Sequence, residues 1–278
     1  MTVDLPEELA RRVELCSAWR GVRYAEAYQR LHPDAQTAVI ETAGGSAVYL
    51  APESPLNSAR AMGLTGPVKA ADLEDLEDFY RQRGVSTIVH VCPLADKGLI
   101  ELVRERGYVL HHFFSVLVRA IPASFKPAPL PPGMTVRPAA AHEAGQWLLA
   151  SAQGFESTSE PSEAIFDILG PNFHAKDSVP YTAWIKDREG HTHLVGTGGM
   201  YLYHRVRAFE LGGASTLMPF RRMGVQRALI EARLAEGLHQ GCDLAMVLTS
   251  PGTNSERNLF RAGFRLAYTK VVMEKLLD

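Results

Sequence analysis

The sequence has few cysteines and no strong excess of charge of either sign. Only three of its 278 residues are cysteines, and Cys16, Cys92 and Cys242 lie far apart among apolar neighbours. An odd number of isolated thiols excludes a disulfide framework and predicts buried, reduced cysteines in a reducing compartment. We therefore expect a cytoplasmic protein.

Other partner classes are excluded by what is missing. The formal net charge is only -2 at pH 7, which favours neither nucleic acid nor an anionic membrane as a partner. No apolar run approaches the length of about 18 residues that a membrane helix needs. The ten histidines show no metal-binding spacing such as H-E-x-x-H, and we predict no metal.

Length and composition instead indicate two globular domains. The chain exceeds the usual size of one domain, and its 46% hydrophobic and 22% charged residues are ordinary for a folded protein. The segment Lys126–Gly133 contains four prolines, which fix an extended backbone as in a semi-rigid linker. We predict a first domain at 1–125, a linker at 126–133 and a second domain at 134–278.

The second half alternates strand and helix patterns. Apolar residues at three- and four-residue spacing predict a helix from Gly224 to His239. The triplet Gly196-x-Gly198-Gly199 lies inside a predicted strand, so we expect a bulge or a close ligand there rather than a dinucleotide loop. Runs rich in β-branched and aromatic residues predict an antiparallel meander at 180–186, 193–203 and 206–217.

A possible internal repeat links the two halves. A strand, a helix and a second strand follow Gly84, with Gly107 ending the helix; the same order follows Gly241, with Gly263 in the corresponding place. Turn residues in register over this distance indicate duplication of one fold.

A basic loop joins the strand ending at Leu217 to the predicted helix. The first turn of a helix leaves backbone N–H groups without partners, and the helix dipole adds positive potential. Gly224 has no side chain to hold a ligand off the backbone, while Arg221 and Arg222 add charged donors. The turn suits a pyrophosphate; the alternative is a solvated basic helix start.

This arrangement resembles the GNAT superfamily of acetyl-CoA-dependent N-acetyltransferases. The shared order is a strand, Arg-x-x-Gly-x-(Gly or Ala), a long helix, a strand and a short helix ending in Gly-Phe, here Gly263-Phe264. The resemblance covers the whole of 134–278. It implies an α/β (α+β) fold of two GNAT-like domains, each a mixed, mostly antiparallel twisted sheet flanked by helices, with acetyl-CoA as cosubstrate.

The resemblance also implies contacts to acetyl-CoA. Asn258 would supply an amide near the pantetheine, or else it is a helix-surface residue; Ser255 would be the small residue nearby. Backbone groups that pair with the pantetheine arm would come from Ala214, Ser215, Thr216 and Leu217. The pyrophosphate would be held by Arg221, Arg222, Met223, Gly224, Val225, Gln226 and Arg227.

Three positions depart from the family pattern. Gln226 replaces the last Gly or Ala and adds bulk or a donor beside the phosphates. Gly252 replaces a common asparagine. Leu259 replaces the tyrosine that often protonates the leaving thiolate, and Tyr268 is the candidate substitute, unless it is a core or rim residue.

An uncharged amine is required for attack on the thioester, so a general base is expected. Glu210 is the candidate, since it precedes Arg221 by eleven residues, a spacing similar to that of the catalytic glutamate in some histone acetyltransferases. The alternative is a solvent-facing strand carboxylate.

The first half has no equivalent anion site. The turn that would match, Leu64–Lys69, contains Pro67, which lacks an N–H, and no arginine. The following helix opens with Asp72, whose charge would repel phosphate. We predict an N-acetyltransferase that moves an acetyl or short acyl group to an amine of an unidentified acceptor, in an unspecified oligomeric state. The alternatives are a non-catalytic acyl-CoA sensor and an interaction protein.

Overall fold

The computed structural model describes residues 6–277 and divides into two compact units. Unit 1 contains the described chain up to Leu117 together with 248–256 and the chain from Arg265 onward. Unit 2 contains 118–247 and 257–264. Among the described helices, none combines the length and hydropathy that spanning a membrane requires.

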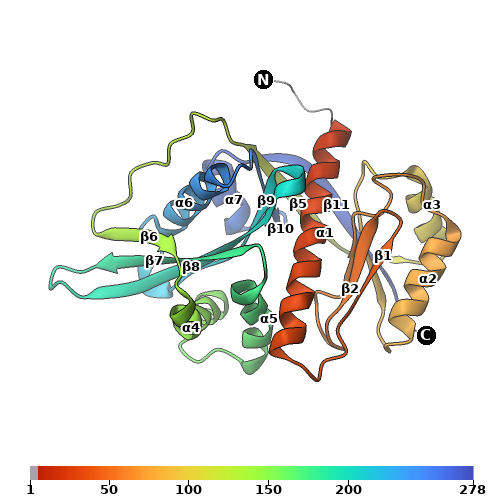
Figure 1. Ribbon diagram of the computed structural model, residues 1–278, viewed down its shortest axis with the longest axis horizontal. Helices are drawn as coiled ribbons and strands as arrows, with labels where there is room; N and C mark the ends of the chain where they lie inside the picture. Colours follow the sequence, from red (N-terminus) through yellow and green to blue (C-terminus); the bar gives the residue numbers. More distant parts are fainter. Residues whose placement is uncertain (1–5, 278) are drawn as a thin grey trace. The chain divides into compact units, whose positions relative to one another are not determined.

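Unit 1 is a mixed sheet with helices packed on it (Figure 1). Its helices are α1 (Pro6–Leu31), which contacts β2 and β3, α2 (Ala70–Arg81), which contacts β4, and α3 (Lys97–Glu105). The strand order is β1-β2-β3-β4-β11-β5. The bounds are β1 (Ala38–Thr42), β2 (Gly45–Tyr49), β3 (Ser58–Arg60), β4 (Thr87–Val91), β5 (Val109–Ala120) and β11 (Arg265–Lys275).

The last strand of the described chain completes unit 1. Strand β11 pairs antiparallel with β4, from Val271 opposite Val91 to Lys275 opposite Thr87. Conversely, the last three residues of β5 are counted in unit 2, and so is the linker at 126–133. The compact units therefore differ from the domain limits expected from the linker. The pairing of β11 with β4 joins residues far apart in the sequence. No local pattern therefore predicts that β11 belongs to unit 1.

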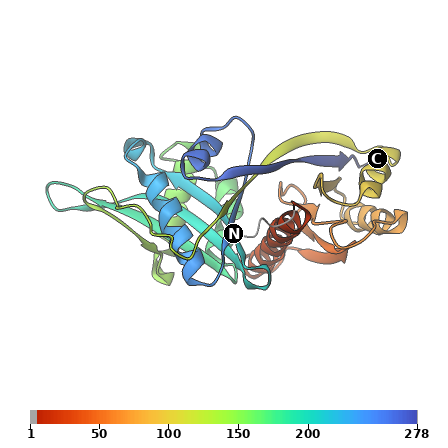
Figure 2. The same ribbon diagram turned by 90° about the horizontal axis from the view of Figure 1, so that it is seen from above.

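Unit 2 contains the predicted antiparallel meander, with α6 on one face and α4 and α5 on the other (Figures 1 and 2). Strand β10 pairs parallel with β9, giving the order β10-β9-β8-β7-β6. The strands are β6 (Met134–Pro138), β7 (Ser178–Lys186), β8 (Thr192–Tyr203), β9 (Ala208–Thr216) and β10 (Leu244–Thr249). The helices are α4 (Ala144–Glu156), α5 (Glu163–His174) and α6 (Val225–His239), with single turns η1 (Ala141–Glu143), η2 (His204–Val206) and η3 (Met218–Phe220). Helix α7 (Asn254–Arg261) and the end of β10 are divided between the two units.

The core of unit 2 fixes the helices on the meander. Trp147 of α4 is fully buried and its indole N–H donates to the carbonyl of Tyr181 at 3.0 Å. Phe209 of β9 packs so closely on α6 that a Cβ added to Gly237 would lie 2.1 Å from its ring. These contacts anchor α4 to β7 on one face of the sheet and α6 to β9 on the other.

Candidate functional site

Strands β9 and β10 pair over only three residues and then separate. The parallel ladder ends where Met246 stands opposite Glu210, but β9 continues to Thr216. Residues Leu211–Thr216 keep β8 as their partner on one side and have no ladder partner on the side of β10. An unpaired strand edge presents N–H and C=O groups to which an extended ligand can add as a strand.

A β-bulge bends β9 where the separation begins. The register between β8 and β9 shifts, so that Gly213 and Ala214 together stand opposite Gly198. Gly213 has a φ of 59°, a left-handed conformation that glycine adopts at little cost. A bulge of this kind bends the strand and increases its twist. The bulge predicted from the glycine triplet is confirmed.

Arg233 of α6 fills the space beside the bulge. Its guanidinium donates to the carbonyl oxygens of Gly199 at 2.8 Å and Gly212 at 3.4 Å, and its Nε donates to Leu229 at 2.9 Å. The residue is 1% exposed, and a Cβ on Gly198 would lie 3.0 Å from the guanidinium carbon. Burial lowers the pKa of Arg233 to about 10, which still leaves it charged at neutral pH. The bulge is thus built around a buried cation that satisfies its carbonyl groups.

The loop after β9 leads into a helix start without a side-chain cap. Arg222 and Gly224 have φ values of 67° and 82°, and no side chain bonds to the first turn of α6. Ala228 is bonded to the carbonyl of Gly224, so the N–H groups of 225–227 have no intrahelical partner. Left-handed residues in such a turn point successive N–H groups into one concavity. These N–H groups have the backbone arrangement of helix starts at which anions bind in other proteins.

The guanidinium of Arg221 is engaged elsewhere. It donates to the carbonyl of Gly154 at 3.1 Å and to Ser157 Oγ at 2.7 Å, while its Nε donates to the carbonyl of Thr216 at 3.3 Å. Gly154 and Ser157 lie at the carboxyl end of α4, where the helix dipole favours a cation. Arg221 therefore ties α4 to the loop with donors that the sequence assigned to a pyrophosphate.

Side chains at the end of β9 are also used within the protein. Gln226 donates from Nε2 to Thr216 Oγ1 at 2.8 Å, so its amide is held by the strand. Ser215 donates to the carbonyl of Ala150 at 3.4 Å and shares a hydrogen bond of 3.1 Å with Thr197. What β9 offers a ligand here is its backbone edge.

The proline-rich linker packs along α6 up to the basic turn. The N–H of Ala128 donates to Glu231 Oε2 at 3.2 Å. Further along the linker, a Cβ on Gly224 would lie 3.2 Å from Pro131 Cγ. Glycine at position 224 is thus required both by its positive φ and by the linker.

Glu210 lies at the last paired position before β9 and β10 separate. It is 0% exposed, so the alternative of a solvent-facing carboxylate is wrong. Glu210 stands directly opposite Tyr201 of β8, which places both side chains on one face of the sheet. The hydroxyl of Tyr201 donates to Asn172 Oδ1 of α5 at 2.7 Å. Glu210 therefore faces the side covered by α5, beside the point where the strands part.

The remaining predicted site residues are divided between the two units. Ser255 is exposed and lies in unit 1. Asn258 of α7 lies in unit 2 and accepts a hydrogen bond from Arg261 at 3.3 Å, as a helix-surface residue does. Tyr268 lies on β11 in unit 1, where its hydroxyl donates to Glu14 at 2.7 Å. Burial and then the charge of Glu14 raise the pKa of Tyr268 far above its usual value.

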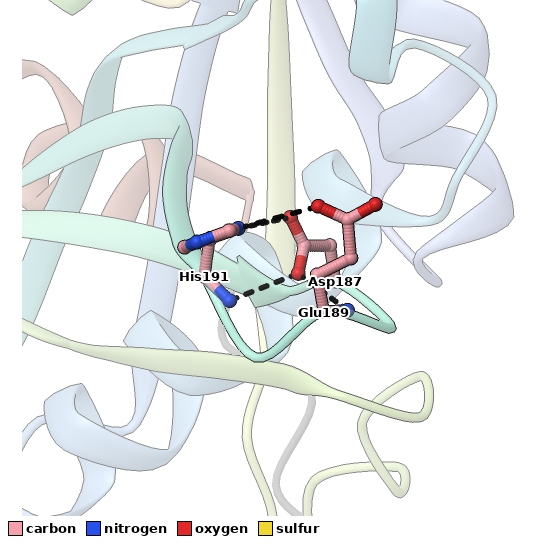
Figure 3. Close-up of side chains that lie close together, drawn as sticks. All are labelled: Asp187, Glu189 and His191. Carbon is pink, nitrogen blue, oxygen red and sulfur yellow. Dashed lines mark hydrogen bonds and ion pairs between the residues drawn. The ribbon is translucent and has the colours of Figure 1, made fainter.

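A group with metal-binding atoms lies at the turn between β7 and β8. One ligand atom each from Asp187, Glu189 and His191 lies within 4.8 Å of the others (Figure 3). Hydrogen bonding from His193 holds the pKa of Asp187 below its usual range. The prediction of no metal rested on the absence of spacings such as H-E-x-x-H. The residues of this turn have a different spacing, Asp-x-Glu-x-His-x-His, with a glycine between Glu189 and His191.

No family profile and no curated protein sequence matches the chain. Among solved structures, it is similar to a GCN5-related N-acetyltransferase from Kribbella flavida, with a TM-score of 0.62 and 18% identity over 93% of this chain and 95% of that one. It is also similar to a tandem GNAT protein from the clavulanic acid biosynthesis pathway (TM-score 0.58, 13% identity, 87% and 84% covered) and to FemX (0.52, 9%, 92% and 91%). The predicted α/β fold of the GCN5-related N-acetyltransferases is confirmed.

Proposed function

We propose that the chain transfers an acetyl or other short acyl group from coenzyme A to an amine. The observation that carries the proposal is the position of two features at one end of β9, the unpaired edge Leu211–Thr216 and the uncapped start of α6. The edge spans about 17 Å, which suits an extended pantetheine arm. Its amides would bond to the backbone of Ala214–Leu217, and the pyrophosphate would lie against the N–H groups of Arg222–Arg227.

Glu210 is the proposed general base. It would take a proton from the ammonium form of the acceptor, directly or through water, so that the nitrogen has a free electron pair. The nitrogen then forms a bond to the thioester carbon, the carbon–sulfur bond breaks with its electron pair on sulfur, and the nitrogen releases its extra proton to water to give the neutral amide. N–H groups on the β9 edge would stabilise the negative oxygen between these two events.

The leaving thiolate needs no strong acid. A thiol has an ordinary pKa of about 8.5, so coenzyme A can depart as the anion and take a proton from water. Leu259, buried where the family often has tyrosine, is compatible with this route. We leave Tyr268 out of the proposed catalytic group because its hydroxyl is bonded to Glu14 in unit 1.

The rest of the proposal follows the sequence. The acceptor is an unidentified amine, unit 1 binds no coenzyme A, and neither nucleic acid nor a membrane is a partner. The cytoplasmic location stays a prediction. Leu259 also favours a second candidate, a non-catalytic acyl-CoA sensor. An interaction protein without coenzyme A is a third.

Calorimetric titration with acetyl-CoA tests the binding step. We expect one equivalent bound per chain. No heat and no thermal shift at millimolar acetyl-CoA would exclude both the enzyme and the sensor.

Thiol release with a panel of amines tests the chemistry. Replacing Glu210 with Gln should lower kcat by about 10²- to 10⁴-fold while leaving the acetyl-CoA dissociation constant unchanged. Glu143→Gln is the matched control, because Glu143 is also buried in unit 2 but bonds to Arg137. If no amine releases thiol, the sensor is favoured; equal rates in Glu210→Gln and wild type remove Glu210 from the mechanism.

A further inference from the structure

We propose that the turn between β7 and β8 binds a divalent transition-metal ion through Asp187, Glu189 and His191, with His193 as a hydrogen-bonded outer-shell partner of Asp187. This proposal does not depend on the acyl transfer, because the four residues lie outside the site around β9. They all belong to unit 2. Figure 3 shows three of the side chains converging above the turn.

The separations between the ligand atoms fit one ion. His193 Nε2 lies 2.8 Å from Asp187 Oδ2, and His191 Nδ1 lies 3.5 Å from the same oxygen and 3.6 Å from Glu189 Oε2. Around a tetrahedral zinc ion with bonds of about 2.0–2.2 Å, neighbouring ligand atoms are about 3.4 Å apart. The two distances from His191 Nδ1 match, and the shorter one marks His193 as a hydrogen-bond partner of Asp187 outside the ligand group.

The backbone holds these side chains in position. Asp187 Oδ1 accepts the N–H groups of Glu189 and His191, both at 2.9 Å, which leaves Oδ2 for a ligand role. His193 is paired with Ile185 in the ladder, which fixes its position beside Asp187. Three ligand groups and this partner thus come from seven residues, and binding requires little further ordering of the chain.

Charge and ligand type indicate the class of ion. Neither Asp187 nor Glu189 forms an ion pair with a lysine or arginine in the described part of the chain. A dication would neutralise both carboxylates. The His191 imidazole distinguishes this group from an ordinary acidic surface cluster, because imidazole nitrogen suits zinc, nickel and copper, whereas magnesium and calcium prefer oxygen alone.

The surroundings indicate a structural rather than a catalytic ion. The side chains of Glu189 and His191 are 81% and 69% exposed, so the ion would exchange with the solution. The ring of His193 lies 6.2 Å from that of Phe220 in η3, which precedes the basic turn. A bound ion would therefore fix the end of the hairpin beside the loop that leads into α6.

Zinc titration of the full chain tests the proposal. After dialysis against EDTA, calorimetry with zinc chloride at pH 7.5 should show one equivalent bound, and magnesium chloride at the same concentration should show none. Since loss of an outer-shell partner costs about 10- to 100-fold in affinity, His193→Asn should weaken zinc binding at least tenfold, and Asp187→Asn, which removes a ligand, should weaken it at least as much. Affinity should also fall at pH 5.5, where protons compete for the imidazoles.

The matched control is His204→Asn, which changes an exposed histidine beyond the opposite end of β8. It should bind zinc as the wild type does. The proposal is overturned by an absence of zinc binding, by equal affinity in His193→Asn and wild type, or by an equal loss in His204→Asn. Circular dichroism verifies that each variant is folded. We expect folded variants because these side chains are exposed or partly exposed.

Discussion

The two units build the start of a helix after a strand in opposite ways. In unit 2, no side chain caps the first turn of α6. In unit 1, the N–H groups just before α2 are taken by carboxylates: Val68 donates to Asp96 Oδ2 at 3.1 Å and Lys69 to Asp72 Oδ2 at 2.8 Å. Carboxylates stabilise a helix start as a bound phosphate would. Side chains thus accept N–H groups at the helix start in unit 1, whereas none does so at the start of α6 among the described residues.

The strand pairs beside these helices differ in the same sense. Strands β3 and β4 form a single parallel pair, Ala59 opposite Val89. The segments that follow β3 and β4 remain hydrogen-bonded to each other, because the N–H of Asp96 donates to the carbonyl of Gly63 at 2.8 Å. Met62 is buried there, with 1% of its surface exposed. The gap that remains open between β9 and β10 is closed here by the protein itself.

The largest expected effect comes from the buried charges of unit 1. Lys270 of β11 donates to both oxygens of Glu14 at 3.0 and 3.1 Å, and both residues are 0% exposed. Lys270→Met leaves that carboxylate buried without its cation and should cost about 3–5 kcal/mol of unfolding free energy. Urea denaturation measures this.

Lys275→Met is the control, since its partner Glu77 keeps Arg106 at 2.7 Å, and it should cost clearly less. The double variant Glu14→Leu/Lys270→Met should recover most of the loss. A double variant as unstable as Lys270→Met would show that the charges are not the cause.

The second prediction removes the open helix start. Gly224→Val forces a β-branched residue into a φ of 82° and covers the free N–H groups. Because a hydrogen bond to a charged group contributes about 1.5–3 kcal/mol, we expect acetyl-CoA to bind at least about 100-fold more weakly by calorimetry. Gly241→Val is a close control: its φ is 80°, with open space around a Cβ. Equal affinities in the two variants would move the coenzyme away from α6.

The third prediction concerns the acid stability of unit 2. Two hydrogen bonds from Arg137 and one from the N–H of Ala140, all 2.7 Å, lower the pKa of Glu143 to about 2. A lowered folded-state pKa stabilises the protein above the ordinary pKa of 4.5 and is lost as pH falls toward 2. Glu143→Gln should cost about 1–3 kcal/mol at pH 7.

That cost should shrink below pH 4.5 and disappear near pH 2. Urea denaturation of both proteins across this range measures the difference. A cost that does not change with pH would assign the loss to packing instead of charge.

The smallest effect is expected from weakening a carboxylate contact at the helix start of unit 1. Asp96→Asn weakens the bond to Val68 and should cost about 1 kcal/mol. It should not create a second coenzyme site, because Pro67 still lacks an N–H and Asp72 still occupies the next one. Calorimetry should again give one equivalent of acetyl-CoA; two equivalents would show that a single carboxylate kept the site closed.

Local patterns predicted the elements of unit 2 and the open turn. The three- and four-residue spacing indicated α6, and the glycine triplet indicated the bulge, because both depend on neighbouring residues. The partners of Arg221, 67 and 64 residues away, have no such signal. Nor does the pairing of Glu14 with Lys270, 256 residues apart. The sequence therefore predicted the elements around the turn better than the distant partners that its side chains bond.

The position of β11 in unit 1 also affects the order in which the chain can fold. Most of unit 1 is complete at Leu117, but its strand β11 begins at Arg265. At a synthesis rate of about 5–20 residues per second, the strand beside β4 arrives roughly 7 to 30 s later. During that interval β4 presents an unpaired edge, the kind of surface on which chains aggregate. The first unit to be synthesised is thus the last whose sheet can close.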